Sequence, residues 1–363
     1  MYSLLGLCDA LAGLPEVDLR ILTTDTAGPQ LAQRVCIEGY PTRYPPGYEV
    51  WFTRRRLGAS FAPRMYAELP AFIRWADVVH LTAVYSSPTL PTLCLCRALK
   101  KPLVWSPRGS LQRWTGTSNR VPKWIWESIA GLLSDPARML LHCTSPEEAE
   151  ASTRRIRLAS VIIPNGVETP QPRPRLARTP GGALRVLYLG RIHSIKALDQ
   201  LIAAVGLAPR GTIELTVAGS GDADLLTRLK ALGLELGLSS QLRFVGHVEG
   251  EAKEELFDTH DILVLPSHRE NFGMVVAEAL SRGVPVIVSR GTPWKAAEER
   301  GCGLWVANDP ASLYGGMTRM ASADLENMGA AGRSWMSAEF SWNAVAQRML
   351  HAYRELICNA NRS

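Results

Sequence analysis

The chain has 363 residues and a mass of 39.8 kDa, which is enough for about two domains of roughly 100–200 residues each. Hydrophobic residues make up 46% and charged residues 20%, which excludes a disordered chain. No apolar run approaches the roughly 18 residues that cross a bilayer, and the first residues lack the basic start of a signal peptide. The seven cysteines form no CxxC pair. This argues against a disulfide scaffold or a structural zinc site and predicts a cytoplasmic protein.

The positive charge is concentrated in the first half of the chain. The net charge is +6; residues 1–165 hold 19 basic and 13 acidic residues, and the remainder holds 21 of each. The densest stretch is residues 51–123, where twelve basic residues, Arg113 among them, accompany two acidic ones, and six of the ten tryptophans fall before residue 130. A basic, Trp-rich face fits an anionic lipid surface, where each Lys or Arg contributes about 1 kcal/mol. It predicts peripheral contact with the inner face of the cytoplasmic membrane. A solvated basic face over core tryptophans explains the pattern equally well. Nucleic acid is not an expected partner, because no recognised binding module is matched.

Short β-rich apolar runs alternate with helical stretches in two sets. The first set predicts strands at residues 18–24, 77–82, 101–106, 139–144 and 160–166, and the second at 184–190, 213–219, 242–248, 261–267 and 284–290. Runs this apolar are typical of parallel strands buried on both faces, and the segments between them suit crossover helices. The Pro- and Arg-rich stretch at 169–182 predicts a linker. We therefore expect two doubly wound α/β units, with ligands at the carboxyl ends of the strands in the cleft between domains.

A glycine and two cations follow the first strand of the second set. Gly190 and Arg191 come directly after its apolar residues, and Lys196 precedes a predicted helix. Glycine lets the backbone turn close to a ligand, and the helix N-terminus and the two cations suit a diphosphate. Exposed Arg and Lys near a loop are also commonplace, so on these residues alone both interpretations stay open.

The segment 270–278 predicts the other half of a ligand site. It follows the strand predicted at 261–267 and leads into a helix. Free N–H groups at a helix start can bind sugar hydroxyls or a phosphate, and a carboxylate is a natural acceptor for a ribose diol. Glu270 and Glu278 are eight positions apart, which predicts both carboxylates on one helix face. Phe272, Gly273 and the apolar residues after them favour burial over a solvent-exposed acidic face.

The loop 217–221 carries part of a dinucleotide-binding fingerprint. It supplies the first two glycines, but Asp224 stands where the third is required, so a nicotinamide enzyme is poorly supported. Asp222 and Asp224 also form a DxD sequence, which binds a divalent metal in some sugar transferases. Because they open a predicted helix, an N-terminal cap is the preferred interpretation.

Together these segments resemble the retaining glycosyltransferases of family 4, which have the two-domain GT-B fold. The resemblance is carried by IPNGV (163–167), LGRIHSIKALDQLI (189–202), VAGSGD (217–222), VGHV (245–248), LPSHRENFGMVVAEALSRGVPVI (265–287) and GCGLWV (301–306), with SPRG (106–109), TSPEEAE (144–150) and FSWNAVAQRMLHAYREL (340–356). It runs from about Ser3 to the end, and the SPRG sequence is typical of a subset in bacterial surface-polysaccharide synthesis. It implies two Rossmann-like domains facing across a cleft. These are an acceptor-side domain at 1–168, a linker at 169–182, a nucleotide-sugar-binding domain at 183–340, and a last helix at 341–363 that returns to the first domain.

The resemblance also implies the residues of the site. It places Gly190, Arg191 and Lys196 at the donor diphosphate, and Glu270, Asn271, Phe272, Gly273, Met274 and Val275 around the transferred sugar. It assigns Glu278 to the ribose. Relatives need no bound metal or other cofactor. Retention by same-face attack, with the diphosphate accepting the acceptor's proton, requires no protein nucleophile, so Glu270 is expected to orient the sugar.

Three features bear on this assignment. Relatives begin with a β-strand and a glycine-rich loop, whereas the sequence from Met1 resembles the first helix directly, which predicts a misassigned start codon or a truncated, inactive protein. Loss of a central strand would leave its two neighbours unpaired. Arg108 stands where many relatives carry a histidine; it can offset charge on the departing phosphate but cannot act as a general base. His80 ends an apolar strand and is expected to be structural.

The expected function is transfer of a sugar from a nucleoside diphosphate sugar to a glycan or lipid-linked glycan acceptor. The expected setting is the biosynthesis of a cell-surface polysaccharide such as lipopolysaccharide. Two alternatives remain. One is an epimerase or a phosphorylase on the same fold, and the other is a non-catalytic partner subunit that binds a sugar nucleotide.

Overall fold

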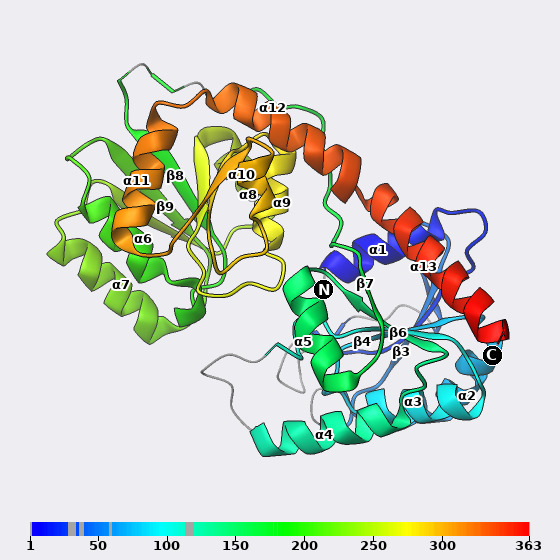
Figure 1. Cartoon of the computed structure of the whole chain (residues 1–363). Coiled ribbons are helices and arrows are strands. Elements are labelled where there is room, and N and C mark those ends of the chain that lie inside the picture. Colours follow the sequence, from blue (N-terminus) through cyan, green and yellow to red (C-terminus); the bar gives the residue numbers. More distant parts are fainter. Residues whose placement is uncertain are drawn as a thin grey trace. The chain divides into compact units, whose positions relative to one another are not determined.

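The structure, a computed structural model, describes residues 2–27, 34–35, 40–57, 60–112, 120–176, 178–179 and 181–362. It divides the chain into two compact units, Met1–Gly166 with Trp342–Ser363, and Val167–Ser341. Each unit consists of β-sheet covered by helices (Figure 1). Met1 and Arg113, which figure in the sequence-based expectations, lie outside the described residues.

In the described part of the second unit, six parallel strands form one sheet in the order β10-β9-β8-β11-β12-β13. The strands are β8 (Leu184–Leu189), β9 (Ile213–Ala218), β10 (Leu242–Gly246), β11 (Ile262–Leu265), β12 (Val286–Ser289) and β13 (Gly303–Val306). The helical elements are η1 (Ser194–Lys196), α6 (Leu198–Gly206), α7 (Ala223–Glu235), α8 (Glu251–Thr259), α9 (Met274–Ser281), α10 (Ala296–Glu299), α11 (Pro310–Ala321), α12 (Leu325–Trp335) and η2 (Met336–Phe340). In Figure 1, α6, α7 and α11 lie on one side of this sheet and α8 and α9 on the other.

The predicted apolar runs form the centre of this sheet. β11 and β12 are buried along their whole length, as expected for parallel strands between two layers of helices. The edge strand β10 has only half-buried and exposed residues, so the prediction that every run is buried on both faces is wrong there. β13 is absent from the predicted set; it pairs with β12 at the other edge.

The strand order of the second unit reverses between β8 and β11. From β8 the chain builds outward through β9 to β10, then returns to the other side of β8 and builds outward through β12 to β13. Ile262 of β11 pairs with Val186 of β8. The loops that leave the carboxyl ends of β8 and β11 therefore flank the switch point, where open α/β sheets bind ligands.

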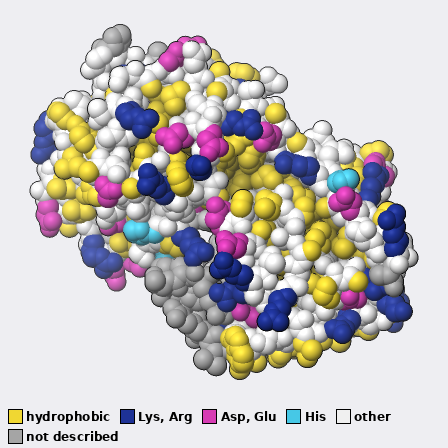
Figure 2. Space-filling model, viewed as in Figure 1, with side chains coloured by type: hydrophobic (Ala, Val, Ile, Leu, Met, Phe, Trp, Pro, Cys, Tyr) yellow, Lys and Arg dark blue, Asp and Glu magenta, His cyan; other side chains and the backbone are white. Residues whose placement is uncertain are grey.

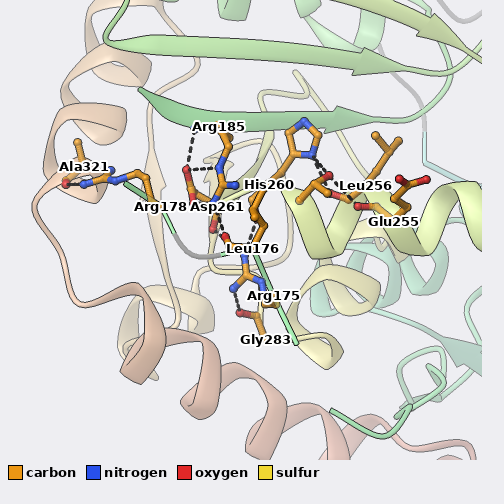
Figure 3. A network of polar contacts seen from close by, with 11 residues as sticks. Arg175, Leu176, Arg178, Arg185, Glu255, Leu256, His260, Asp261, Gly283 and Ala321 are labelled. Atoms are coloured by element: carbon orange, nitrogen blue, oxygen red, sulfur yellow. Dashed lines mark hydrogen bonds and ion pairs between the residues drawn. The ribbon is translucent and has the colours of Figure 1, made fainter. Parts of the chain in front are cut away.

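The Pro- and Arg-rich segment 169–182 runs along the second unit and is bound to it (Figure 3). The Arg175 guanidinium donates to the carbonyl oxygens of Gly283 at 2.6 Å and His260 at 2.5 Å. Both carbonyls lie just before strands, so the segment crosses the amino ends of the sheet, opposite the switch-point loops. The division between the units falls before this segment, at residues 166–167.

In the described part of the first unit, the strands form two separate sheets. One is parallel in the order β4-β5-β6-β7, and in the other, β1-β3-β2, β1 is parallel and β2 antiparallel to β3. The strands are β1 (Arg20–Thr24), β2 (Thr42–Arg43), β3 (Glu49–Thr53), β4 (Val79–Thr82), β5 (Leu103–Ser106), β6 (Met139–Cys143) and β7 (Ser160–Ile162). β2 and β3 are absent from the predicted set. Among the described strands, β1 pairs with β3 and β4 pairs with β5, so each of them ends a sheet.

The helices of the first unit include the last helix of the chain. They are α1 (Tyr2–Ala12), α2 (Pro63–Trp75), α3 (Thr89–Ala98), α4 (Arg120–Leu133), α5 (Pro146–Ile156) and α13 (Trp342–Arg362). A Cβ atom on Gly6 of α1 would lie 2.3 Å from the Trp342 ring, and one on Gly166 would lie 2.2 Å from it. These glycines therefore admit the indole that begins α13. The apolar face of α13 then packs with α1 through Val345, Met349 and Leu356. No described helix is both long and apolar enough to span a bilayer.

Candidate functional site

The loop after β8 holds two cations on a fixed backbone. The Tyr188 hydroxyl donates to the Arg191 carbonyl oxygen at 3.0 Å, and the backbone then makes the short 3₁₀ turn Ser194–Lys196. The Arg191 side chain is exposed and that of Lys196 is half-buried. Gly190, Arg191 and Lys196 thus lie together at the carboxyl end of β8, where the sequence places them.

Two glycines after β9 allow the backbone there to pack closely against the loop after β8. A Cβ atom on Gly219 would lie 1.9 Å from the carbonyl oxygen of Gly190, and one on Gly221 would lie 2.0 Å from that of Ile192. Gly219 also has a φ of +143°, which disfavours other residues. These glycines, which the sequence presents as part of a dinucleotide fingerprint, are explained by contact with the backbone on both sides of Arg191.

The helix after β11 begins at Met274. Gly273, with φ +81°, is its N-cap, and no side chain caps the helix, so the first-turn N–H groups of Met274 and Val275 have no intrahelical partner. Glu270 lies in the preceding loop, and Glu278 lies in the second turn of α9. The expectation that both carboxylates share one helix face is therefore wrong, because the left-handed Gly273 interrupts the backbone between them.

Lys196 and Glu270 are in contact. The Lys196 ammonium donates to the Glu270 carboxylate, and the two side chains are only 16% and 15% exposed. The Ser267 hydroxyl donates to the same carboxylate at 3.2 Å. The backbone N–H of His268 donates to the Ile195 carbonyl oxygen at 2.8 Å. The loops after β8 and β11 are therefore joined at the switch point, with a cation and an acid at the join.

Glu278 has a cation of its own. Its Oε1 lies 2.8 Å from the Nζ of Lys253, in the first turn of α8. Sequence reasoning missed Lys253, because no motif marks it and its partner is 25 positions away. Only its contact with Glu278 in the folded structure identifies Lys253.

The ring of Phe272 belongs to the core. It is 5% exposed and lies 5.2 Å from the Trp294 ring, whose Nε1 donates to the Phe272 carbonyl oxygen. This anchors the loop that carries Glu270 and the half-buried Asn271. Phe272 can therefore offer only its backbone to a ligand, and its side chain holds the loop in place.

The Asp222 carboxylate caps α7. Its Oδ1 accepts a hydrogen bond from the Leu225 N–H at 2.9 Å, which confirms the capping interpretation of the DxD sequence. Among the described residues, no three His, Cys, Asp or Glu side chains gather where they could share a metal ion.

Arg108 lies just after β5 in the first unit, with a left-handed backbone (φ +53°). Its Nη1 donates to the Asn165 side-chain oxygen, and its Nη2 is buried without a hydrogen-bond partner among the described residues. Burial lowers the pKa of this guanidinium, but an arginine stays charged at neutral pH. Its role at a departing phosphate stays a prediction.

His80 belongs to a buried chain of hydrogen bonds. Its Nδ1 lies 2.5 Å from the Tyr353 hydroxyl and its Nε2 lies 2.6 Å from the Ser106 hydroxyl. Ser106 Oγ also lies 2.7 Å from His142 Nδ1, and His142 Nε2 lies 2.9 Å from the Ile163 carbonyl oxygen. Burial lowers the pKa of both imidazoles, that of His142 to about 3. Both are therefore neutral at pH 7, and both nitrogens of His80 are bonded, as expected for a structural histidine.

Two family models together match nearly the whole chain. The model for Glycosyltransferase Family 4 matches residues 3–171, and the model for Glycosyl transferases group 1 matches residues 176–335. The chain belongs to the family 4 glycosyltransferases. The resemblance seen in the sequence motifs is thereby confirmed for both halves of the chain.

Individual relatives match over about half of their length. The chain is 30% identical over 174 residues to an uncharacterized glycosyltransferase of Methanocaldococcus jannaschii, covering 47% of this chain and 44% of that protein. It is 31% identical over 212 residues to a D-inositol 3-phosphate glycosyltransferase of Geodermatophilus obscurus, covering 53% of this chain and 47% of that protein. This chain thus spans about half the length of the curated relatives that it matches.

Solved structures share the fold over most of the chain. Sucrose-phosphate synthase of Thermosynechococcus elongatus has a TM-score of 0.71 at 20% identity and covers 97% of this chain and 92% of its own. WaaG, a glycosyltransferase involved in lipopolysaccharide biosynthesis, has a TM-score of 0.65 at 15% identity, with 96% and 94% covered. Anabaena HepE in complex with UDP has a TM-score of 0.66 at 17% identity, with 85% and 86% covered. These likenesses confirm the α/β fold of the GT-B class.

Proposed function

We propose that this protein transfers a sugar from a nucleoside diphosphate sugar, with retention of configuration, to a glycan or lipid-linked glycan acceptor in the biosynthesis of a cell-surface polysaccharide. The observation that carries the proposal is the contact between Lys196 and Glu270 at the switch point, beside the uncapped start of α9. A cation, an acid and free N–H groups at one point suit a ligand with both phosphates and hydroxyls. The HepE structures with UDP and with UDP-glucose support the choice of donor.

In the proposed reaction, three side chains of the second unit act on the donor. Arg191 and Lys196 offset the charge that grows on the leaving diphosphate, which is electrostatic stabilisation of the transition state. Glu270 accepts hydrogen bonds from sugar hydroxyls and fixes the position of the anomeric carbon. The bond from that carbon to the diphosphate breaks as the bond to the acceptor oxygen forms, and the acceptor's proton passes to the departing diphosphate. No protein nucleophile takes part.

A transfer assay tests this proposal. Labelled UDP-, GDP- and ADP-sugars are incubated with the protein and a lipid extract, and labelled glycan or lipid is counted. Lys196→Ala is expected to lower kcat/KM by about 100-fold or more, because it removes a charge used in the transition state. Lys230, an exposed lysine on α7, provides the charge-matched control, and Lys230→Ala should retain full activity. Full activity of Lys196→Ala would contradict the proposal.

The same assay separates the alternatives. A transferase releases nucleoside diphosphate in step with the glycosylated acceptor. An epimerase converts the sugar and leaves the acceptor unlabelled, and a phosphorylase that uses pyridoxal phosphate shows the absorbance of that cofactor. A non-catalytic subunit binds the donor and releases no nucleotide with any acceptor. Each of these three results would replace the proposed activity.

We also propose that α4 of the first unit contacts an anionic membrane surface. Its inner face carries the buried Glu127, whereas its outer face exposes Trp124, Ile125, Ile129 and Leu132. Figure 2 shows hydrophobic side chains along the edge of the molecule where α4 lies. Arg97 donates to the Leu132 carbonyl oxygen at one end of this face, and Lys123 lies near its start. An apolar helix face with cations at both ends fits an anionic lipid interface.

Vesicle binding tests the membrane proposal. The protein should sediment with vesicles that contain anionic phospholipid, and less so when salt rises from about 0.1 M to about 0.5 M. The double substitution Trp124→Ser/Ile129→Ser should abolish sedimentation. Leu234→Ser, at an equally exposed leucine on α7 that is 67% exposed, should not. Equal binding of the two variants, or indifference to anionic lipid, would contradict this proposal.

A further inference from the structure

Two ion pairs join α8 to α9 in the second unit. The Nζ of Lys253 lies 2.8 Å from Oε1 of Glu278, and Arg282 donates from Nε and Nη2 to the two oxygens of Glu254 at 2.5 Å each. Lys253 and Glu254 are neighbours in the first turn of α8, and Arg282 follows Glu278 by one helical turn. The two pairs therefore connect the same helices. They differ in whether a carboxylate oxygen is left available to a ligand.

In the pair of Arg282 with Glu254, the guanidinium occupies the carboxylate fully. Both carboxylate oxygens accept from the guanidinium, which also donates to the Glu278 carbonyl oxygen at 3.0 Å and lies 5.0 Å from the Phe257 ring. Burial alone would raise the pKa of Glu254, but the hydrogen bonds from Arg282 and the positive charges nearby together hold that pKa below its usual value. This pair joins the helices and leaves no carboxylate oxygen for a ligand.

The pair of Lys253 with Glu278 leaves one carboxylate oxygen without a polar contact among the described residues. An ammonium is a compact charge that makes a single contact here, on Oε1. Within the described residues no other hydrogen bond reaches this carboxylate, and the two side chains remain 24% and 22% exposed. Because α8 follows β10 and α9 follows the β11 loop, the pair lies toward the carboxyl ends of the strands, on the side of Lys196 and Glu270.

We infer that Lys253 is a positioning residue for the nucleoside end of the donor. It holds the carboxylate of Glu278 in one rotamer, so that the second oxygen can accept from the ribose hydroxyls of a nucleoside diphosphate. The inference rests on the proposed function. An ionised acceptor makes a hydrogen bond roughly twice as strong as a neutral one, and a side chain ordered before binding need not be ordered by the ligand. Lys253 therefore raises affinity through Glu278.

Equilibrium titration of the full chain tests the inference. The nucleoside diphosphate that binds most tightly in a panel of UDP, GDP and ADP is compared with its 2′,3′-dideoxy form. Lys253→Met should raise the Kd of the ribonucleotide about tenfold, the loss expected for one charge-assisted bond and one ordered side chain. The same substitution should change the Kd of the dideoxy form by less than about twofold, because that ligand lacks the hydroxyls that donate to Glu278. Lys253→Arg should restore most of the affinity.

Glu254→Gln is the matched control, because it breaks the other ion pair between the same helices. It should lower the thermal midpoint but leave the Kd of the ribonucleotide unchanged. The inference is overturned if Lys253→Met leaves the Kd unchanged, if Glu254→Gln weakens binding equally, or if the dideoxy form shows the same loss. Binding in the wild type with no effect of Lys253→Met would overturn this inference alone. A wild-type protein that binds no nucleoside diphosphate would overturn the proposed function and this inference with it.

Discussion

The ammonium of Lys196 donates a hydrogen bond to the carboxylate of Glu270, 74 positions along the chain. The two residues lie in loops that leave β8 and β11, the strands on either side of the switch point. A diphosphate that approaches Lys196 therefore also approaches a negative charge. Under the proposed function, a bound sugar would lie between the Glu270 carboxylate and the phosphates.

Glu270→Gln should separate sugar positioning from phosphate binding. The amide keeps the size of the side chain but removes the negative charge beside Lys196, so affinity for a nucleoside diphosphate without sugar should stay the same or rise. The kcat for transfer should fall by about 100-fold, because the sugar is no longer held for reaction. Titration calorimetry and the transfer assay measure the two effects. A parallel fall in nucleotide affinity would contradict the assigned role.

Gly219→Ala should displace the loop that carries Arg191. The new Cβ atom would lie 1.9 Å from the carbonyl oxygen of Gly190 at a φ of +143°, so the backbone must move. We expect a loss of about 1–3 kcal/mol in unfolding free energy and a clearly higher Kd for nucleoside diphosphate. Gly315→Ala on α11, where a Cβ atom meets nothing within 4 Å, should be neutral or slightly stabilising. Unchanged nucleotide binding by Gly219→Ala would show that this contact does not support the site.

The buried histidines predict a loss of stability in acid. Burial holds the pKa of His142 at about 3 and that of His80 well below 6.5, whereas both regain a value near 6.5 in the unfolded chain. As the pH falls below 6.5, the unfolded chain binds protons that the folded chain does not, so unfolding free energy falls. The slope is at most about 1.4 kcal/mol per pH unit for each histidine.

Urea unfolding at about pH 7 and about pH 5.5 measures this effect. His142→Asn removes one titrating group, and its amide oxygen can take the place of Nδ1 and still accept from Ser106. The variant should therefore be less sensitive to pH than the wild type. Equal sensitivity in the two proteins would refute the assignment to His142.

Tyr353→Phe tests whether the Tyr353 hydroxyl stabilises the same chain of hydrogen bonds. A carbonyl oxygen only accepts, so His142 carries its proton on Nε2 and its Nδ1 accepts from Ser106. The Ser106 oxygen then accepts from His80 Nε2–H, which leaves His80 Nδ1 as the acceptor for Tyr353. Phenylalanine leaves that buried acceptor unpaired, at a cost of about 1–3 kcal/mol.

The measurement is urea unfolding of Tyr353→Phe beside Tyr66→Phe. Among the described residues Tyr66 makes ring contacts but no side-chain hydrogen bond, so its substitution should change unfolding free energy by less than about 0.5 kcal/mol. Equal costs for the two substitutions would show that the Tyr353 hydroxyl contributes nothing to the stability of the unit.

Local pattern was enough to predict most of the parallel strands and the positions of the polar loops after β8 and β11. Apolar runs identify buried strands, and glycine with cations after a strand indicates a phosphate site. Features that depend on distant contacts could not be predicted. The start of α9 depends on the left-handed Gly273, the role of Lys253 on a partner in another helix, and the binding of 169–182 on carbonyl groups that Arg175 meets far along the chain. The strands β2 and β3 are short or mixed in polarity, so no apolar run marks them.

A crystal structure of the protein with its preferred nucleoside diphosphate sugar tests the central claim most directly. We predict the diphosphate within hydrogen-bond distance of Arg191, Lys196 and the first N–H groups of α9, the ribose on Glu278, and the sugar hydroxyls on Glu270. A nucleotide bound at another place in the second unit, with these four side chains unengaged, would contradict the account.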